Sequence, residues 1–320
     1  MSDAVRHTFG MRRVTWWLCV ASLVLVAVPV VTRLTGFETG PFALLVAFMP
    51  WVTLVCVVPL ALALFARSRV LVACAAALTV LCVWFQLPLF TGGGDGEAKL
   101  TVASVNMTLG EADPDAVVAL VQDNGVDLLS VQELTPQALA ALADAGLDSE
   151  LPYSEAIAEP GVPGTGLWSR YPISDPQDVP GFTAHTVQAT VGAPGGKLTF
   201  LAIHPQAPGK HNHRNWAADL AALNDLLAHT AGPVVVAGDF NTTRDHAGFR
   251  DIEALGYRDA ADQAGSGFAP TFPENRELWP LLVIDHVLER DSGLTALRTW
   301  TAIIPRADHR ALIVAYGSAR

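Results

Sequence analysis

Three long apolar segments occupy the first 90 residues of the chain, at about 14–32, 41–65 and 70–90. Each is nearly free of charged residues and is long enough to cross a bilayer, which takes roughly 20 helical residues. Pro29, Pro50 and Pro59 lie inside these segments, where membrane helices tolerate proline better than soluble helices do. Residues 1–90 are therefore predicted to form a membrane anchor of three transmembrane helices.

The first apolar segment has an alternative interpretation as a cleaved signal peptide. No clear small-x-small cleavage site follows it, and two more apolar segments do. Its removal would leave the rest of the chain on the same side of the membrane, because two spans would then remain.

The basic residues of the anchor predict its orientation. Five of the six basic residues before position 95 lie on one side of the predicted spans: Arg6, Arg12, Arg13, Arg67 and Arg69. The positive-inside rule makes that side cytoplasmic. We therefore expect a multi-pass protein of the cell membrane with a cytoplasmic N-terminus and an extracytoplasmic domain after Phe90.

Beyond a flexible linker of glycine and acidic residues at 91–97, short apolar runs alternate with helical patterns through residues 98–320. Asp113 with Pro114 and Thr135 with Pro136 are signals of helix starts, and 215–229 has a helical apolar face. Strands are expected at 99–106, 126–133, 166–173, 186–191, 198–204, 233–240, 281–287, 294–303 and 311–317. Many strands with few helices predict an α/β fold, a four-layer sandwich of two packed sheets with helices outside.

Composition narrows the choice of partners. The chain has 31 acidic and 20 basic residues, of which two acidic and six basic residues precede position 95. The remainder of the chain therefore has a net charge of −15. Nucleic-acid binding usually requires a basic face, so the charge weighs against a nuclease. All four cysteines (Cys19, Cys56, Cys74 and Cys82) lie in the predicted spans, so the outer domain contains no disulfide.

Polar residues recur at the ends of the predicted apolar strands. Asn106, Glu133 and His204 each end such a strand; the others that end or closely follow one are Asp239, Asn241, Asp308 and His309. A calcium loop starting at Asp239 is excluded, because its sixth and twelfth positions hold Arg244 and Arg250 instead of Gly and Glu. A zinc site from His204, His211 and His213 lacks a completing Cys or nearby acid.

These motifs, in order, are "SVNM", "SVQE", "GTGLWSRYPI", "AIHPQAP", "GDFN", "IDHV" and "ADHR". As a set they resemble the endonuclease/exonuclease/phosphatase family, which has a DNase I-like fold and includes nucleases, sphingomyelinases and inositol-phosphate phosphatases. The resemblance covers about residues 98–317. The N-terminal region with its three predicted spans resembles that of a membrane-anchored bacterial subgroup that includes teicoplanin-resistance proteins.

The resemblance implies a divalent metal, Mg²⁺ or Mn²⁺. Glu133 supplies the hard carboxylate that such a metal prefers. By the same resemblance, Asn106 assists at the metal and Asp308 is a further ligand.

The resemblance also implies the catalytic groups. Asp239 orients and deprotonates the attacking water, and Asn241 holds the phosphate. Protonated His309 stabilises phosphate charge or acts as an acid, with Asp285 fixing its tautomer, while His204 contacts the phosphate or leaving group.

We expect a membrane-anchored, metal-dependent phosphoric ester hydrolase whose partners are the bilayer and a phosphoester, with a phosphorylated envelope lipid as the expected substrate. An extracytoplasmic endonuclease or exonuclease on the same fold is the first alternative. An inactive domain that binds a lipid or envelope partner is the second. Trp279, Leu281 and Leu282 could rest on a lipid surface, although strand core is the simpler interpretation of these residues.

Overall fold

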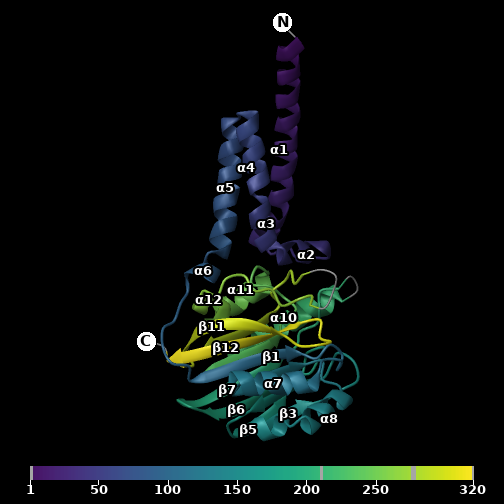
Figure 1. Cartoon of the computed structure of the whole chain (residues 1–320), viewed down its shortest axis with the longest axis vertical. Coiled ribbons are helices and arrows are strands. Elements are labelled where there is room, and N and C mark those ends of the chain that lie inside the picture. The colour runs from purple at the N-terminus through teal and green to yellow at the C-terminus, as the bar shows by residue number, and fades with distance from the viewer. Residues whose placement is uncertain (1–2, 210–211, 275–278, 319–320) are drawn as a thin grey trace. The chain divides into compact units, whose positions relative to one another are not determined.

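The computed structural model describes residues 3–209, 212–274 and 279–318 and divides into two compact units. The first contains the N-terminal helices, and the second contains both β-sheets. Figure 1 shows the elements of both.

The N-terminal unit is helical. Its helices are α1 (Asp3–Thr35), α2 (Pro41–Ala47), α3 (Met49–Val55), α4 (Val57–Ala66) and α5 (Arg69–Gln86), with the short α6 (Pro88–Thr91) following. Three helical stretches are long and apolar enough to cross a membrane: Met11–Thr35, Met49–Ala66 and Arg69–Gln86. The prediction of three candidate spans is therefore confirmed, by length and composition.

The second candidate span is shorter than the predicted 41–65. Its first part forms the separate helix α2, and Phe48 separates α2 from α3. Pro50 explains the break, since it has no N–H to donate to the Val46 carbonyl four residues earlier and its ring would clash with that carbonyl. Arg67, with a left-handed φ of 54°, then reverses the chain between α4 and α5.

The second unit begins before the first strand. Gly93 donates its backbone N–H to the Gln263 carbonyl at 2.9 Å, and a side chain at Gly92 would collide with the Asp262 carbonyl oxygen. Part of the segment expected to be a flexible linker is thus hydrogen-bonded to the domain that it precedes.

Two six-stranded mixed sheets build this unit. Sheet A has the order β11-β12-β1-β2-β4-β3, and sheet B has the order β5-β6-β7-β8-β10-β9. The strands of sheet A are β1 (Leu100–Asn106), β2 (Leu128–Gln132), β3 (Tyr153–Ile157), β4 (Thr165–Ser169), β11 (Leu294–Ile303) and β12 (Arg310–Ser318). Those of sheet B are β5 (Ile173–Asp178), β6 (Val187–Ala193), β7 (Gly196–Ile203), β8 (Val234–Asp239), β9 (Arg258–Asp259) and β10 (Asp285–Arg290).

The helices of this unit are α7 (Pro114–Asn124), α8 (Pro136–Asp144), α9 (Leu147–Glu150), α10 (His213–His229), α11 (Ala247–Ala254) and α12 (Ala260–Ala264). The predicted caps are present: the side chain of Asp113 accepts from Asp115 N, and that of Thr135 accepts from Ala138 N. The predicted strand 166–173 is divided at Arg170–Pro172, so that its two ends lie in different sheets.

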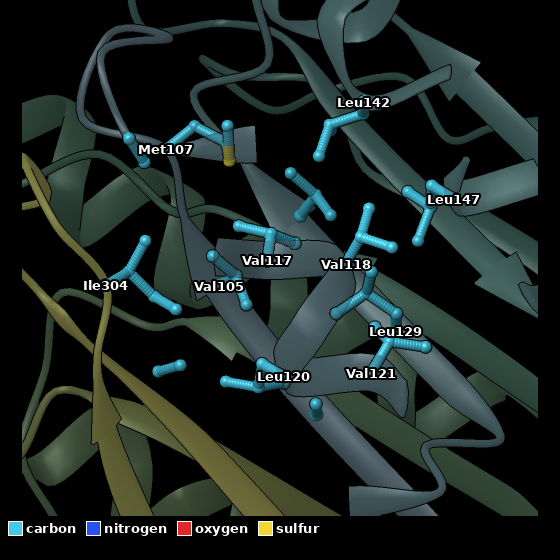
Figure 2. Close-up of a cluster of buried hydrophobic side chains, with 14 of the residues drawn as sticks. Val105, Met107, Val117, Val118, Leu120, Val121, Leu129, Leu142, Leu147 and Ile304 are labelled. Carbon is cyan, nitrogen blue, oxygen red and sulfur yellow. The ribbon is translucent and has the colours of Figure 1, made fainter. Parts of the chain in front are cut away.

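Three apolar clusters hold the layers together. One packs α7, α8 and α9 on the outer face of sheet A, and Figure 2 shows Val105 of β1 and Val117 of α7 among its side chains. The second fills the space between the sheets with residues such as Val102 and Phe200. The third packs α10 and α11 on the outer face of sheet B. The predicted four-layer α/β sandwich is confirmed, and it directs the carboxyl ends of β1, β2, β7 and β8 toward a shared site.

Candidate active site

The predicted site residues lie where two pairs of parallel strands end. In sheet A, β1 ends at Asn106, and Glu133 directly follows β2. In sheet B, His204 directly follows β7, and β8 ends at Asp239. Parallel strands bring their carboxyl ends to one edge of a sheet, and stacking the sheets brings the two edges together.

Side chains from both sheets surround one oxygen atom, Asp239 Oδ2. Asn106 donates an Nδ2 hydrogen to it at 3.1 Å, and the Nε2 atoms of His204 and His309 each lie 3.6 Å away. Burial alone would raise the pKa of Asp239, but the two histidines outweigh burial and lower that pKa. Asp239 is therefore held as a carboxylate although it is almost fully buried.

His309 bridges two carboxylates. Its Nδ1 is 2.9 Å from Asp285 Oδ2, and its Nε2 faces Asp239. Burial would lower the pKa of His309, but Asp285 and Asp239 together raise it to about 10. The ring also packs against Phe272 at a centroid distance of 4.7 Å. Asp285 thus lies directly behind the histidine, as the motifs indicate.

The predicted metal ligands surround one short loop. Glu133 Oε2 accepts from the Leu109 backbone N–H at 2.6 Å, and Asp308 Oδ1 accepts from the Thr108 hydroxyl at 2.7 Å. Asn106 Oδ1 accepts from the Thr108 backbone N–H, and its Nδ2 reaches Glu133 Oε1 at 3.3 Å. Thr108, Leu109 and Glu133 all have left-handed φ angles between 50° and 55°, a conformation that L-residues adopt rarely and that often marks functional sites.

Asn241 is held at three atoms. Its backbone N–H donates to Asp239 Oδ1 at 2.8 Å, its side-chain Nδ2 donates to the Pro205 carbonyl, and its own carbonyl accepts from Trp216 Nε1 at 3.1 Å. Its φ is 48°, again left-handed. The side-chain oxygen is the polar atom that these bonds leave for a ligand.

Among the described residues, one group of three carboxylate and imidazole side chains could hold a metal ion: Asp239, Asp285 and His309. Their ligand atoms lie within 4.8 Å of one another, and the buried Asp285 Oδ1 has no hydrogen-bond partner. Together with Glu133, the oxygen donors at this site fit a hard divalent cation such as Mg²⁺ or Mn²⁺.

Two further predictions concern the alternative zinc site and the segment before β10. His211 is outside the described residues, and His213 opens α10 with its ring against Trp216, so the alternative zinc set with His204 is not assembled in the described part of the chain. Trp279 is 84% exposed, so strand core is the wrong interpretation for that side chain. It lies outside β10, which begins only at Asp285.

The sequence motifs did not reveal all the residues that hold the site. Thr108 links Asn106 to Asp308, and Asp219 of α10 accepts from Gln206 N, which anchors the loop after His204. The buried Thr271 hydroxyl is 3.4 Å from Asp285 N. Only Thr108 has a local signal, because it lies two residues after the end of an apolar strand.

Residues 103–309 match the model of the Endonuclease/Exonuclease/phosphatase family. The chain belongs to this family. Its fold is DNase I-like, and its members are metal-dependent phosphoesterases.

Similar solved structures agree on the fold at low sequence identity. A family protein from Leptotrichia buccalis aligns with a TM-score of 0.54 at 14% identity, covering 68% of this chain and 99% of that one. The mannosyl-6-phosphatase Bt3783 of Bacteroides thetaiotaomicron gives 0.53 at 17% identity, with 68% and 99% covered. A humanized Danio rerio TDP2 gives 0.58 at 16%, also with 68% and 99% covered.

One curated relative is the UPF0294 protein VP2298 of Vibrio parahaemolyticus, which is 26% identical over 156 residues. That match covers 48% of this chain and 46% of the relative. The chain thus spans about half the length of the curated relative it matches.

Proposed function

We propose that this protein is a membrane-anchored phosphoesterase that uses Mg²⁺ or Mn²⁺ outside the cytoplasm and acts on a phosphorylated lipid of the cell envelope. The observation that carries the proposal is the arrangement around Asp239. Side-chain nitrogens of Asn106, His204 and His309 lie within 3.6 Å of Asp239 Oδ2. The partly exposed carboxylate of Glu133 lies next to this group.

Asp239 and His309 each have a task in phosphoester hydrolysis. Asp239, kept ionised by the two histidines, accepts a proton from the attacking water. His309, whose pKa is raised to about 10, is protonated at neutral pH and stabilises the charge of the phosphate. A divalent metal held by Glu133 with Asn106 and Asp308 would neutralise charge on the phosphate.

Two positions compete for the metal, and we favour the one beside Glu133. The group of Asp239, Asp285 and His309 would have to release the His309 proton to bind a cation, because a ligating imidazole nitrogen must be unprotonated. The same carboxylates hold that proton firmly. Glu133, with Asn106 and Asp308 beside the loop that follows β1, needs no such release.

The lipid substrate is supported by the anchor and by charge. Gln86 ends α5 and Leu100 begins β1, so the connecting chain reaches at most about 50 Å at roughly 3.5 Å per residue. A site tethered so closely meets membrane-borne substrates at high effective concentration. The net charge of −15 from residue 95 onward repels long polyanions such as DNA. One similar fold is named a mannosyl-6-phosphatase, an activity on a phosphate ester.

Two features support an extracytoplasmic location of the C-terminal domain: the three candidate membrane helices at the N-terminus, and the excess of arginine on one side of them. They also agree with the membrane-anchored bacterial subgroup that includes teicoplanin-resistance proteins. A polyprenyl phosphate or diphosphate is the envelope lipid that we propose to test first.

The test uses the full-length protein in mixed micelles with Mg²⁺. Undecaprenyl phosphate, undecaprenyl diphosphate and double-stranded DNA are offered separately at equal phosphate concentration, with Asp239→Asn as the inactive control. We expect phosphate release from a lipid that requires Mg²⁺ and is lost in the variant. Faster DNA cleavage that falls steeply with salt would instead establish the nuclease, and no turnover with retained lipid binding would establish the inactive binding domain.

A further inference from the structure

His286 follows Asp285 on β10 and points to the opposite face of sheet B. Asp285 turns toward His309, while the His286 ring packs with Phe240 and Phe249 of the outer apolar cluster. This opposition is the alternation that a strand imposes on consecutive residues. His286 is 2% exposed, and its hydrogen bonds go to Asp259 and Thr242, not to Asp239 or His309.

Both ring nitrogens of His286 have acceptors. Nδ1 lies 2.8 Å from Asp259 Oδ2, and Nε2 lies 3.1 Å from the Thr242 carbonyl oxygen. A carbonyl can only accept, so Nε2 carries a hydrogen and donates it. Asp259 is itself fixed, since its Oδ1 accepts from Ala261 N at the start of α12.

The Thr242 carbonyl belongs to the residue directly after Asn241. The preceding carbonyl, that of Asn241, accepts from the indole N–H of Trp216 at 3.1 Å. Two consecutive carbonyls are therefore held by two buried ring N–H donors, one from α10 and one from β10. The left-handed backbone of Asn241 directly precedes the first of these two carbonyls, and a backbone of this kind persists only where neighbouring groups hold it.

We propose that His286 is a positioning residue that holds Asn241 in its left-handed conformation through the bond from Nε2 to the Thr242 carbonyl. The kinetic part of this inference rests on the proposed phosphoesterase function. The structural part does not, because it concerns only the backbone after β8.

Three variants separate this role from the pairing with Asp259. In His286→Gln, the amide nitrogen can take the place of Nε2 and still donate to Thr242. In His286→Asn, the shorter amide takes the place of Nδ1 and can reach only Asp259. In His286→Phe, the ring stays between Phe240 and Phe249 without either bond. Leu288→Ala is the matched control, because Leu288 is buried on the same strand and in the same apolar cluster.

The first measurement is hydrogen–deuterium exchange of the full-length protein in detergent, followed by mass spectrometry of peptides that cover residues 240–243. We expect at least tenfold faster exchange of this segment in the Asn and Phe variants, and protection close to the wild type in the Gln variant and in Leu288→Ala. The reverse order, with Asn protected and Gln exposed, would assign His286 to Asp259 alone and overturn the inference. Unchanged exchange in all variants would overturn it as well.

The second measurement is Mg²⁺-dependent hydrolysis of bis(p-nitrophenyl) phosphate by the same preparations. We expect kcat/KM to fall about 10- to 100-fold in the Asn and Phe variants, since small misplacements at active sites have effects of this size. In an Asn241→Ala background, His286→Phe should cause no further loss, because its effect passes through Asn241. A wild type that hydrolyses neither this probe nor the lipid phosphates contradicts the proposed function, while the exchange data still decide the role of His286. A full additional loss in the Asn241→Ala background would contradict the positioning role.

Discussion

His309 Nδ1 and Asp285 Oδ2 lie 2.9 Å apart, although the two residues are 24 positions apart in the sequence and lie at the starts of strands in different sheets. Asp285 opens β10 in sheet B, and His309 precedes β12 in sheet A. Their hydrogen bond therefore crosses from one sheet to the other. It fixes the hydrogen on Nδ1 and aims Nε2 at Asp239.

Asp285→Asn is predicted to lower kcat by a factor of about 10² or more, because an amide no longer stabilises the protonated ring. Combined with His309→Ala, the loss should be far smaller than the product of the two single losses, since the residues act as one unit. Steady-state kinetics of the two single variants and the double variant check this. Independent, multiplicative losses would contradict the pairing.

Removal of divalent metal is predicted to abolish hydrolysis, and Glu133→Gln is predicted to weaken metal binding by at least about tenfold, since hard cations depend on carboxylate oxygens. Electron paramagnetic resonance of Mn²⁺ titrated into the full-length protein measures the affinity without any substrate. Asp285→Asn is the comparison, and it should change the affinity much less. A larger effect of Asp285→Asn would place the metal at the Asp239, Asp285 and His309 group instead.

Gly238→Ala is predicted to destabilise the domain strongly. A Cβ at this position would lie 2.1 Å from the Ile203 carbonyl oxygen on the neighbouring strand β7, and strain of this kind costs several kcal/mol, about 3 or more. Gly192→Ala in β6 is the control, because its Cβ would come no closer than 3.7 Å to another atom. Thermal unfolding should show a marked loss for the first variant only, and equal melting temperatures would refute the close-approach argument.

His185 is predicted to make stability depend on pH. Burial would lower its pKa, but Glu159 and Asp178, at 3.2 Å and 2.8 Å, outweigh burial and raise that pKa. A histidine with a raised folded pKa contributes stability that is complete below its unfolded pKa, about 6.5. That contribution is lost as the pH rises through the higher folded value. The melting temperature of the wild type should therefore exceed that of His185→Gln most at pH 5–6 and converge toward it by pH 9. A difference that grows with pH would show that the sign is wrong.

The orientation of the anchor is predicted from its arginines to leave the C-terminus outside the cytoplasm. Alkaline phosphatase fused after Arg320 should be active, and green fluorescent protein fused at the same place should remain dark when exported in unfolded form. Fusions after Arg67, which is expected to be cytoplasmic, provide the opposite control. Fluorescence of the C-terminal fusion would show that the topology is the reverse of the predicted one.

The sequence by itself determined most of the elements and their order. Apolar runs, the caps at Asp113 and Thr135, and the polar residues at strand ends are local features, so they can be read directly from neighbouring residues. The family motifs extended this to the fold, because they occur together in one order over residues 98–317. Edge strands such as β3 and β5 were missed as separate elements, since their exposed residues lack a strong apolar pattern.

Only the tertiary structure decided which groups meet and through which atoms. Thr108, Asp219 and His286 hold Asp308, the loop after His204 and the backbone after Asn241, respectively, and the family resemblance assigned a role to none of the three. Likewise, the raised pKa of His309 depends on Asp285 and Asp239, which reach it from sheet B. Local patterns record how a segment folds, whereas these contacts depend on how two sheets stack, and sheet stacking joins residues that are far apart in the chain.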